Sequence, residues 1–300
     1  MRSLLERFRA AVAMPAVLAA FAAFAAIAGT TTAQAAEELW ALSTNNNLYN
    51  FSSTSPGTLS LRPITGLMPG ETALAIDFRP AMPVGRLYVL GSTNRVYLIA
   101  DPNSGVATPV GGAPFATALA GLEFGFDFNP TVDRIRIVSD ADQNLRAQPD
   151  LGTIAAVDSM LAFNVGDPNF GTNPRVTGAA YTNSFAGAAT TVLYDIDSNL
   201  DVLATQLPPN NGKLNTVGSL GVDATDDNGF DISGATGVAY AVFGWGPTTA
   251  ALYTINLSTG GATLVGPVGC NERLRGLSVG REFPTPTLDS SWGKIKDTYR

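Results

Sequence analysis

The sequence contains no histidine, a single cysteine and only 14% charged residues. Without histidine, Ser-His-Asp and Cys-His catalysis are excluded, and zinc, copper and non-haem iron sites lose their commonest ligand. The lone Cys270 excludes an intramolecular disulfide and a thiolate cluster, and we expect a buried, inert thiol there. These absences leave few routes to catalysis, so we expect no cofactor and favour a protein that is not an enzyme.

Charge and hydrophobicity set further bounds. Acidic residues outnumber basic ones by 25 to 18, which gives a formal net charge of −7 and disfavours a nucleic-acid partner. The hydrophobic fraction of 45% is enough for a large core. The composition therefore predicts a folded, acidic protein, and we expect it to be a monomer.

The N-terminal segment has the features of an export signal. Three arginines in the first nine residues precede an uncharged, alanine-rich run from 10 to 36. The run ends in Ala33-Gln34-Ala35-Ala36, the small-residue pattern that signal peptidase recognises. We predict a signal peptide over 1–35, export to the periplasm or the extracellular space, and no membrane insertion after cleavage. A retained N-terminal membrane anchor is the alternative, because the uncharged run is long enough to span a bilayer.

The rest of the chain repeats. A short apolar strand recurs every 47 to 53 residues, and a second and a third strand, a turn ending in glycine and a fourth strand follow most copies. Periods of this length are typical of propeller blades. The five copies of the first strand are Ala75–Phe78, Gly125–Phe128, Gly178–Tyr181, Gly229–Ile232 and Gly276–Val279.

The two ends of the repeat complement each other. Leu39–Leu42, Leu48–Phe51, a turn at Ser55–Gly57 and Thr58–Leu61 supply strands two to four without a first strand, whereas Gly276–Val279 is a first strand with nothing after it. Together they make one shared blade. We therefore predict an all-β fold, a β-propeller of five four-stranded blades closed by its terminal strands. A β-solenoid or a β-sandwich is the alternative.

This organisation divides the chain into three parts. The propeller domain is predicted over 36–283, between the signal peptide and a C-terminal tail at 284–300. The tail is polar and basic and carries aromatic residues. It is expected to be either a disordered terminus or a sorting or docking tag.

Long motifs in the second and third repeats resemble a known family. Gly121–Pro130, Val132–Asp140, Gln143–Arg146 and Ala179–Ser184 are similar to a bacterial secreted family described as domain of unknown function 4394 (DUF4394). The resemblance covers about Leu39–Val279. It implies a secreted, propeller-like domain, and it implies no activity and no catalytic residues.

Three aspartates occupy one position of the repeat. Asp77, Asp127 and Asp231 each stand in the first strand, which lines the channel of a propeller, so we expect their carboxylates to approach one another. A cluster of this kind suits a cation or acid/base work, with Glu123 as a candidate acid, as in glycoside hydrolysis by paired carboxyls. The structural alternative is that each aspartate caps backbone amides or pairs with an arginine between blades.

Two arginines share a strand face next to these aspartates. Arg134 and Arg136 lie two residues apart and therefore point to the same side of their strand. Such a pair suits an anionic sugar or a carboxylate. A salt-bridge network between blades is the alternative explanation.

Two acidic segments do not have the spacing of an EF-hand calcium loop. Asp140–Asn144 has oxygen ligands at alternate positions, but it lacks the glycine and the glutamate that an EF-hand loop requires, and Asp223–Gly229 fails the same test. We expect turns at both places and no metal among the site residues, with calcium as the open alternative. The sequence as a whole favours an exported propeller that binds a glycan or a protein partner. The alternative is a carboxylate-based glycoside hydrolase or lactonase acting at the channel.

Overall fold

Strands make up almost all regular structure in the part of the chain that is described, residues 35–82 and 85–280 of a computed structural model. One short 3-10 turn, Pro209–Asn211, is the exception within those ranges. Along the chain the strands are β1 (Glu38–Ser43), β2 (Asn47–Ser52), β3 (Ser55–Pro63), β4 (Ala73–Phe78), β5 (Leu87–Gly91), β6 (Arg95–Ile99), β7 (Ala107–Pro109), β8 (Phe124–Asn129), β9 (Arg134–Ser139), β10 (Asn144–Gln148), β11 (Thr153–Val157), β12 (Ala162–Phe163), β13 (Val176–Tyr181), β14 (Leu193–Asp197), β15 (Val202–Gln206), β16 (Lys213–Ser219), β17 (Gly229–Ile232), β18 (Ala239–Gly244), β19 (Ala250–Ile255), β20 (Ala262–Pro267) and β21 (Leu274–Val279).

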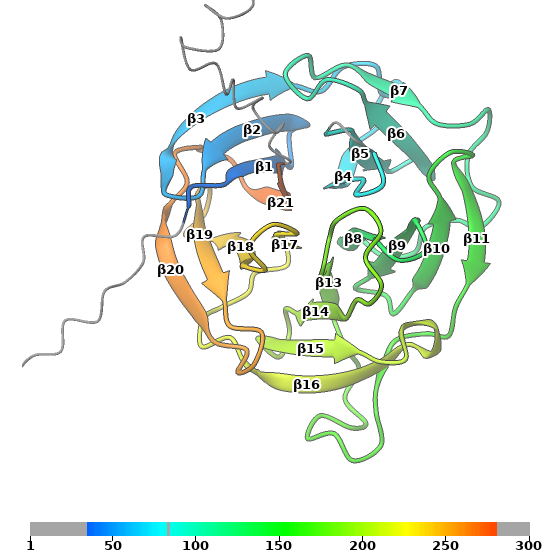
Figure 1. The fold of residues 1–300 in the computed structure, drawn as a ribbon, viewed down its shortest axis with the longest axis vertical. Coiled ribbons are helices and arrows are strands. Elements are labelled where there is room, and N and C mark those ends of the chain that lie inside the picture. The colour runs from blue at the N-terminus through cyan, green and yellow to red at the C-terminus, as the bar shows by residue number, and fades with distance from the viewer. Residues whose placement is uncertain (1–34, 83–84, 281–300) are drawn as a thin grey trace, which may run out of the picture. The chain divides into compact units, whose positions relative to one another are not determined.

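The strands form five blades around an axis (Figure 1). Each blade is an antiparallel sheet, and its first strand, one of β4, β8, β13, β17 and β21, lies innermost. The predicted five-bladed β-propeller is confirmed. We name the blades β4–β7, β8–β11, β13–β16 and β17–β20 by their strands, and we call β21-β1-β2-β3 the closing blade.

The closing blade joins the two ends of the propeller. Strand β1 pairs antiparallel with β21, with Leu39 opposite Val279 and Ala41 opposite Leu277. This pairing leaves neither strand with a long bare edge, the outcome that the complementary half-blades of the sequence predict.

Two details differ from the sequence prediction. Strand β3 begins at Ser55, so the turn lies at Ser53-Thr54 and not at Ser55–Gly57. In addition, Ala162 and Phe163 form β12, a short parallel strand on the outer edge of the β13–β16 blade. The repeat gave no signal for this strand because no other blade has a copy of it.

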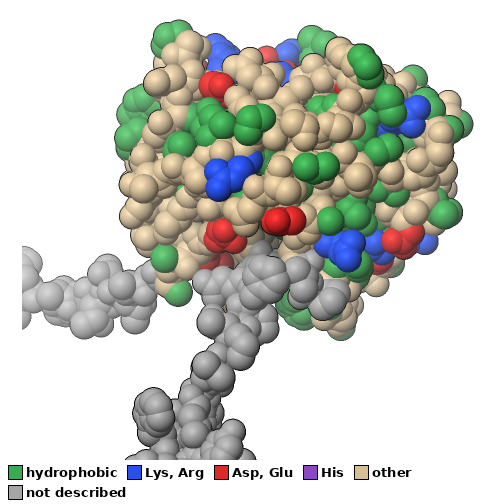
Figure 2. All heavy atoms as spheres, turned by 90° about the horizontal axis from the view of Figure 1, so that it is seen from above, with side chains coloured by type: hydrophobic (Ala, Val, Ile, Leu, Met, Phe, Trp, Pro, Cys, Tyr) green, Lys and Arg blue, Asp and Glu red, His purple; other side chains and the backbone are tan. Residues whose placement is uncertain are grey.

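The core lies between the blades. The cluster between the β4–β7 and β8–β11 blades shows the pattern, because Tyr88 packs edge-on against Phe128 with ring centroids 5.0 Å apart. Both faces of a blade are buried in this arrangement, so strand β4 is buried along its whole length. Two apolar faces per blade explain the low charge of the sequence, and charged groups are sparse on the side of the ring seen in Figure 2.

The inner strands approach one another closely near the axis. A side chain at Gly229 would place its Cβ 2.3 Å from the carbonyl carbon of Gly276 in the next inner strand, so only glycine fits there. Each inner strand is also a sheet edge, since its second side faces the axis. Its free N–H groups therefore need partners from outside the blade.

The described residues contain no helix with the length and the hydrophobicity that a membrane crossing requires. The predicted signal peptide and the C-terminal tail lie outside the described residues.

Candidate functional site

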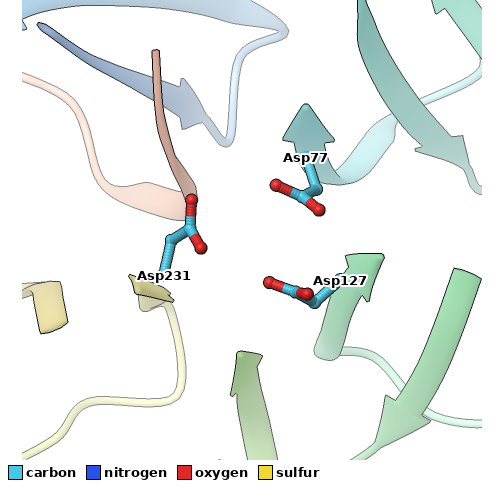
Figure 3. Close-up of side chains that lie close together, drawn as sticks. All are labelled: Asp77, Asp127 and Asp231. Carbon is cyan, nitrogen blue, oxygen red and sulfur yellow. The ribbon is translucent and has the colours of Figure 1, made fainter. Parts of the chain in front are cut away.

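Three aspartates of the inner strands meet at the axis (Figure 3). Asp77, Asp127 and Asp231 each contribute a carboxylate oxygen to a group in which all three oxygens lie within 4.8 Å of one another. The residues are only 3%, 1% and 4% exposed. The sequence-predicted convergence is therefore present, but solvent barely reaches it. We call these three residues the axial triad.

Asp77 and Asp231 connect neighbouring blades. Asp77 Oδ2 accepts a hydrogen bond from Phe128 N–H of the next inner strand at 2.9 Å. Asp231 Oδ2 accepts one from Val279 N–H of the next inner strand at 2.6 Å. Both aspartates also accept from the N–H that follows them in their own strand. These carboxylates satisfy the free N–H groups of the sheet edges.

In the remaining inner strands, the equivalent position offers a similar acceptor in two cases and none in the third. Asp127 accepts from the backbone N–H of Tyr181 in the next inner strand, and Ser278 Oγ accepts from Phe78 N–H at 3.1 Å. Ala180 holds the equivalent position in β13 and offers no acceptor. The aspartates therefore have the amide-capping role that the sequence analysis gave as their structural alternative.

Ser278 also connects the members of the triad. Its Oγ lies 2.7 Å from Asp77 Oδ1 and 3.1 Å from Asp231 Oδ2. The sequence around it, Gly276-Leu277-Ser278-Val279-Gly280, matches the G-x-S-x-G pattern of a nucleophile elbow, which sequence reasoning passed over. Ser278 is 0% exposed and the chain has no histidine to activate it, so the match is not a catalytic one.

Burial and mutual repulsion dominate the electrostatics of the triad. Desolvation raises the pKa of Asp77 well above its usual range, and the neighbouring Asp231 adds to the effect. Desolvation, Asp77 and Asp231 together raise the pKa of Asp127 in the same direction. Burial raises the pKa of Asp231 to about 6, against the hydrogen bonds from Val279 and Ile232 N–H. At neutral pH three full negative charges at this place are unfavourable.

Arginines do not neutralise the triad, although the sequence offered several as partners. Among the described residues none of the ion pairs includes an axial carboxylate. Arg79 instead pairs with Asp133 and Asp150, and Arg146 pairs with Asp158.

Arg134 and Arg136 have different surroundings. Arg136 is 2% exposed, and its guanidinium lies 2.7 Å from Asp158 Oδ2 and 2.8 Å from Asn210 Oδ1 of the next blade. Arg134 donates to the backbone carbonyls of Val132 and Asp133 in its own turn. The two side chains therefore do not form a shared anion-binding face, because Arg136 takes part in an inter-blade network.

A second charged group lies where the inner strands begin. Because strands in a blade alternate in direction, the loops before the inner strands and the turns between second and third strands meet on one face of the ring. Acidic and arginine side chains from four blades contact one another there. We call them the channel-mouth cluster: Glu123, Asp140, Arg175, Asp226, Asp227, Arg273 and Arg275.

Some pairs of this cluster are tight and others are loose. Arg175 Nη2 lies 2.7 Å from Asp226 Oδ2, and Arg273 Nη1 lies 2.9 Å from Asp227 Oδ2. Arg275 Nη2 is 3.7 Å from Glu123 Oε1, beyond hydrogen-bond distance. The buried Nε of Arg275 has no hydrogen-bond partner. Polar capacity is therefore left over at the centre of the cluster.

Glu123 is a member of the channel-mouth cluster whose pKa is shifted to near neutrality. Desolvation raises its pKa to about 7, Arg275 opposes the rise, and Asp227 and Asp140 add to it. Its side chain is 15% exposed, so solvent reaches it. Glu123 does not lie with the axial triad and belongs to the mouth.

The surroundings of the mouth are partly apolar. Leu122 is 74% exposed beside Glu123, and Trp245 is 47% exposed in the turn whose Pro247 carbonyl accepts from Arg273. A cavity of about 10 Å³, room for about one water, lies below the cluster and is lined by Arg275 and Asn228. The mouth thus combines charged, polar and aromatic groups around a shallow centre.

The sequence analysis did not predict most of this cluster, because most of its members lie in loops that do not repeat. The signal that would have found them is topological. In a propeller, the residues just before a first strand lie on the same face of the ring as the turns between second and third strands. Arg175 and Arg273 are of the first kind, and Asp140-Ala141 is of the second.

The family resemblance that the sequence motifs indicate is confirmed. The family model DUF4394, described as a domain of unknown function, matches residues 47–278. Comparison with curated proteins finds no match.

Several solved structures are similar. A protein of unknown function from Bacteroides caccae is 11% identical over 83% of this chain and 100% of that chain, with a TM-score of 0.41. An engineered GH43 glycoside hydrolase with endo-xylanase and exo-arabinofuranosidase activity is 13% identical over 80% and 55%, with a TM-score of 0.43. YCF48 bound to D1 peptide is 11% identical over 76% and 77%, with a TM-score of 0.37. Identities and TM-scores this low carry no argument about function.

Proposed function

The chain belongs to the DUF4394 family of domains of unknown function, and from this premise we propose that it is an exported, non-enzymatic module that binds a glycan at its channel mouth. Export to the periplasm or the extracellular space rests on the N-terminal sequence, and a monomeric state is part of the proposal. The mass of the protein recovered outside the cytoplasm tests export, because cleavage after Ala35 or Ala36 gives a defined new N-terminus.

The observation that supports binding at the mouth is the incomplete pairing of Arg275. Its Nε is buried without a partner, and its Nη2 stands 3.7 Å from carboxylates on two sides, Glu123 and Asp227. Buried polar groups without partners are rare in folded proteins and call for an explanation. The side chain is 13% exposed, so its outer nitrogens would donate to a ligand hydroxyl at the mouth.

The composition of the rim favours a sugar. Carboxylates and guanidinium groups hydrogen-bond to hydroxyls, and an exposed indole such as Trp245 offers a flat apolar face. The cluster holds four acidic and three basic side chains, so it lacks the single-sign field that would select a highly charged partner.

Binding to a panel of immobilised glycans tests the proposal. We expect the wild-type chain to bind a subset of the panel, and Arg275→Gln to weaken that binding about tenfold or more, the usual effect of losing a hydrogen bond from a charged group. Arg62→Gln is the matched control, since Arg62 lies on the outer strand β3 and contacts only backbone carbonyls. Binding of a protein but of no glycan would move the proposal to a protein partner, and equal effects of both substitutions would contradict it.

One observation favours a second function, hydrolysis of a glycoside or a lactone at the mouth. Glu123 has a pKa raised to about 7 and a side chain that solvent reaches, the properties of a general acid. In this case Glu123→Gln would abolish hydrolysis of the substrate while leaving ligand binding intact. The sealed axial triad does not support hydrolysis in the channel itself.

A further inference from the structure

The axial triad gathers more negative charge than its surroundings balance. One oxygen from each of three carboxylates lies within 4.8 Å of the other two, and the three residues are almost fully buried. Among the described residues no cationic side chain pairs with any of them. Buried charges are normally paired or coordinate a metal, because transfer of an unpaired carboxylate out of water costs far more than one hydrogen bond returns.

One oxygen of the triad is left without any hydrogen-bond partner. Asp127 is 1% exposed, and its Oδ1 accepts no hydrogen bond, although its carboxylate faces Asp77 and Asp231 across the axis (Figure 3). The other two carboxylates are held in place by backbone N–H groups of four inner-strand positions. An oxygen without a hydrogen-bond partner, beside two carboxylates held in place by backbone N–H groups, is what a preorganised cation site would present.

We propose that the axis of the propeller binds one calcium ion between the carboxylates of Asp77, Asp127 and Asp231. Calcium takes oxygen ligands at about 2.3–2.6 Å, so any two of its ligands stand at most about 5.2 Å apart. The three oxygens of the triad lie within that limit. Magnesium demands a near-octahedral shell and keeps several waters, whereas calcium accepts less regular shells of carboxylate oxygens, so calcium suits a buried group of carboxylates better. Water completes the shell of the ion.

The ion links three blades that share no covalent connection at the axis. Asp77, Asp127 and Asp231 come from the β4–β7, β8–β11 and β17–β20 blades. The site is therefore structural, and the proposal of a calcium ion does not depend on ligand binding at the mouth. The competing arrangement is a triad that shares protons in place of an ion.

Calorimetric titration of chelator-treated wild-type protein with calcium chloride tests the site. We expect one ion per chain and a thermal midpoint that rises with calcium concentration, because the ion binds the folded state alone. Asp127→Asn removes the charge of the carboxylate that has the unpartnered oxygen and should weaken calcium binding about tenfold or more. The matched control is Asp195→Asn, the same change at another fully buried aspartate, in β14 and outside the triad, and it should bind calcium as the wild type does.

The outcomes separate the two arrangements. If calcium and chelator leave the thermal midpoint of the wild type unchanged, the triad shares protons and the proposal is overturned. An Asp127→Asn variant that binds calcium with wild-type affinity also overturns it. If Asp127→Asn does not fold, crystals of the wild type grown with calcium decide. An anomalous peak among the three carboxylates supports the site, and a peak only at the Asp140–Asn144 or Asp223–Asn228 loops overturns it.

Discussion

Asp231 Oδ2 accepts a hydrogen bond from Val279 N–H at 2.6 Å, and this contact ties the β17–β20 blade to the strand that closes the ring. Asp77 makes the equivalent contact with Phe128 between two other blades. An aspartate repeated in three of the five blades thus satisfies N–H groups of the sheet edges that the propeller geometry exposes at its axis. The aspartates that look most like catalytic groups in the sequence are the ones that hold the inner strands together.

Loss of an axial carboxylate should destabilise the ring. Asp231→Ala removes the acceptor of two buried donors, Ile232 N–H and Val279 N–H. Since each orphaned donor costs about 1–3 kcal/mol, we expect the free energy of unfolding to fall by about 2–5 kcal/mol. Urea denaturation measures it. Asp101→Ala, in an exposed turn where the carboxylate accepts from Asn103 N–H, should change it by less than about 0.5 kcal/mol. Equal losses would contradict the account.

The two arginines of β9 should differ strongly. Arg136→Gln breaks a buried network with Asp158 and Asn210 and leaves Asp158 paired with Arg146 alone, and loss of such charged hydrogen bonds costs about 1.5–3 kcal/mol. Arg134→Gln loses only contacts to turn carbonyls, so we expect less than about 0.5 kcal/mol. Thermal unfolding compares them. The account fails here if Arg134→Gln is as damaging as Arg136→Gln.

Stability should depend on pH through Glu123. Burial raises its pKa from 4.5 to about 7 in the folded chain, so the folded state binds more protons than the unfolded state between those values. Stability therefore falls as pH rises through that window. The difference in the free energy of unfolding between wild type and Glu123→Gln should shift by about 1–2 kcal/mol in favour of the variant between pH 4.5 and a pH above 7. This value includes a reduction for solvent screening, because the group is partly exposed. Urea titrations at both ends of the window measure it, and a gap independent of pH would refute the assignment.

The first residues after the predicted signal peptide also anchor the ring. The Glu37 carboxylate accepts hydrogen bonds from Thr236 at 3.0 Å and from the Tyr240 hydroxyl at 2.8 Å, both in the neighbouring blade. Glu37→Ala should therefore lower the free energy of unfolding by about 2–4 kcal/mol. Its neighbour Glu38 accepts from Asn50 at an exposed site, and Glu38→Ala should cost less than about 0.5 kcal/mol. Chemical denaturation of the two variants, side by side, shows whether the anchor exists.

The sequence predicts the blades well because their first strands repeat. The steps between Phe78, Phe128, Tyr181, Ile232 and Val279 are regular enough to give both the number of blades and the closure. Strand β12 escapes prediction because it has no counterpart in the other repeats.

The site is less predictable for a physical reason. Repetition places Asp77, Asp127 and Asp231 at the axis, but their partners are backbone N–H groups, which carry no side-chain signature in a sequence. The mouth is harder still, because Arg275 and Glu123 are about 150 residues apart and meet only when the ring closes.

The most direct test of a binding module is to measure ligand retention and sugar release in the same samples of wild-type and Arg275→Gln protein, incubated with the glycan panel. The account predicts that the wild type retains a glycan without cleaving it and that Arg275→Gln loses the retention. Release of sugar by the wild type, abolished by Glu123→Gln, would contradict the account and establish an enzyme at the channel mouth.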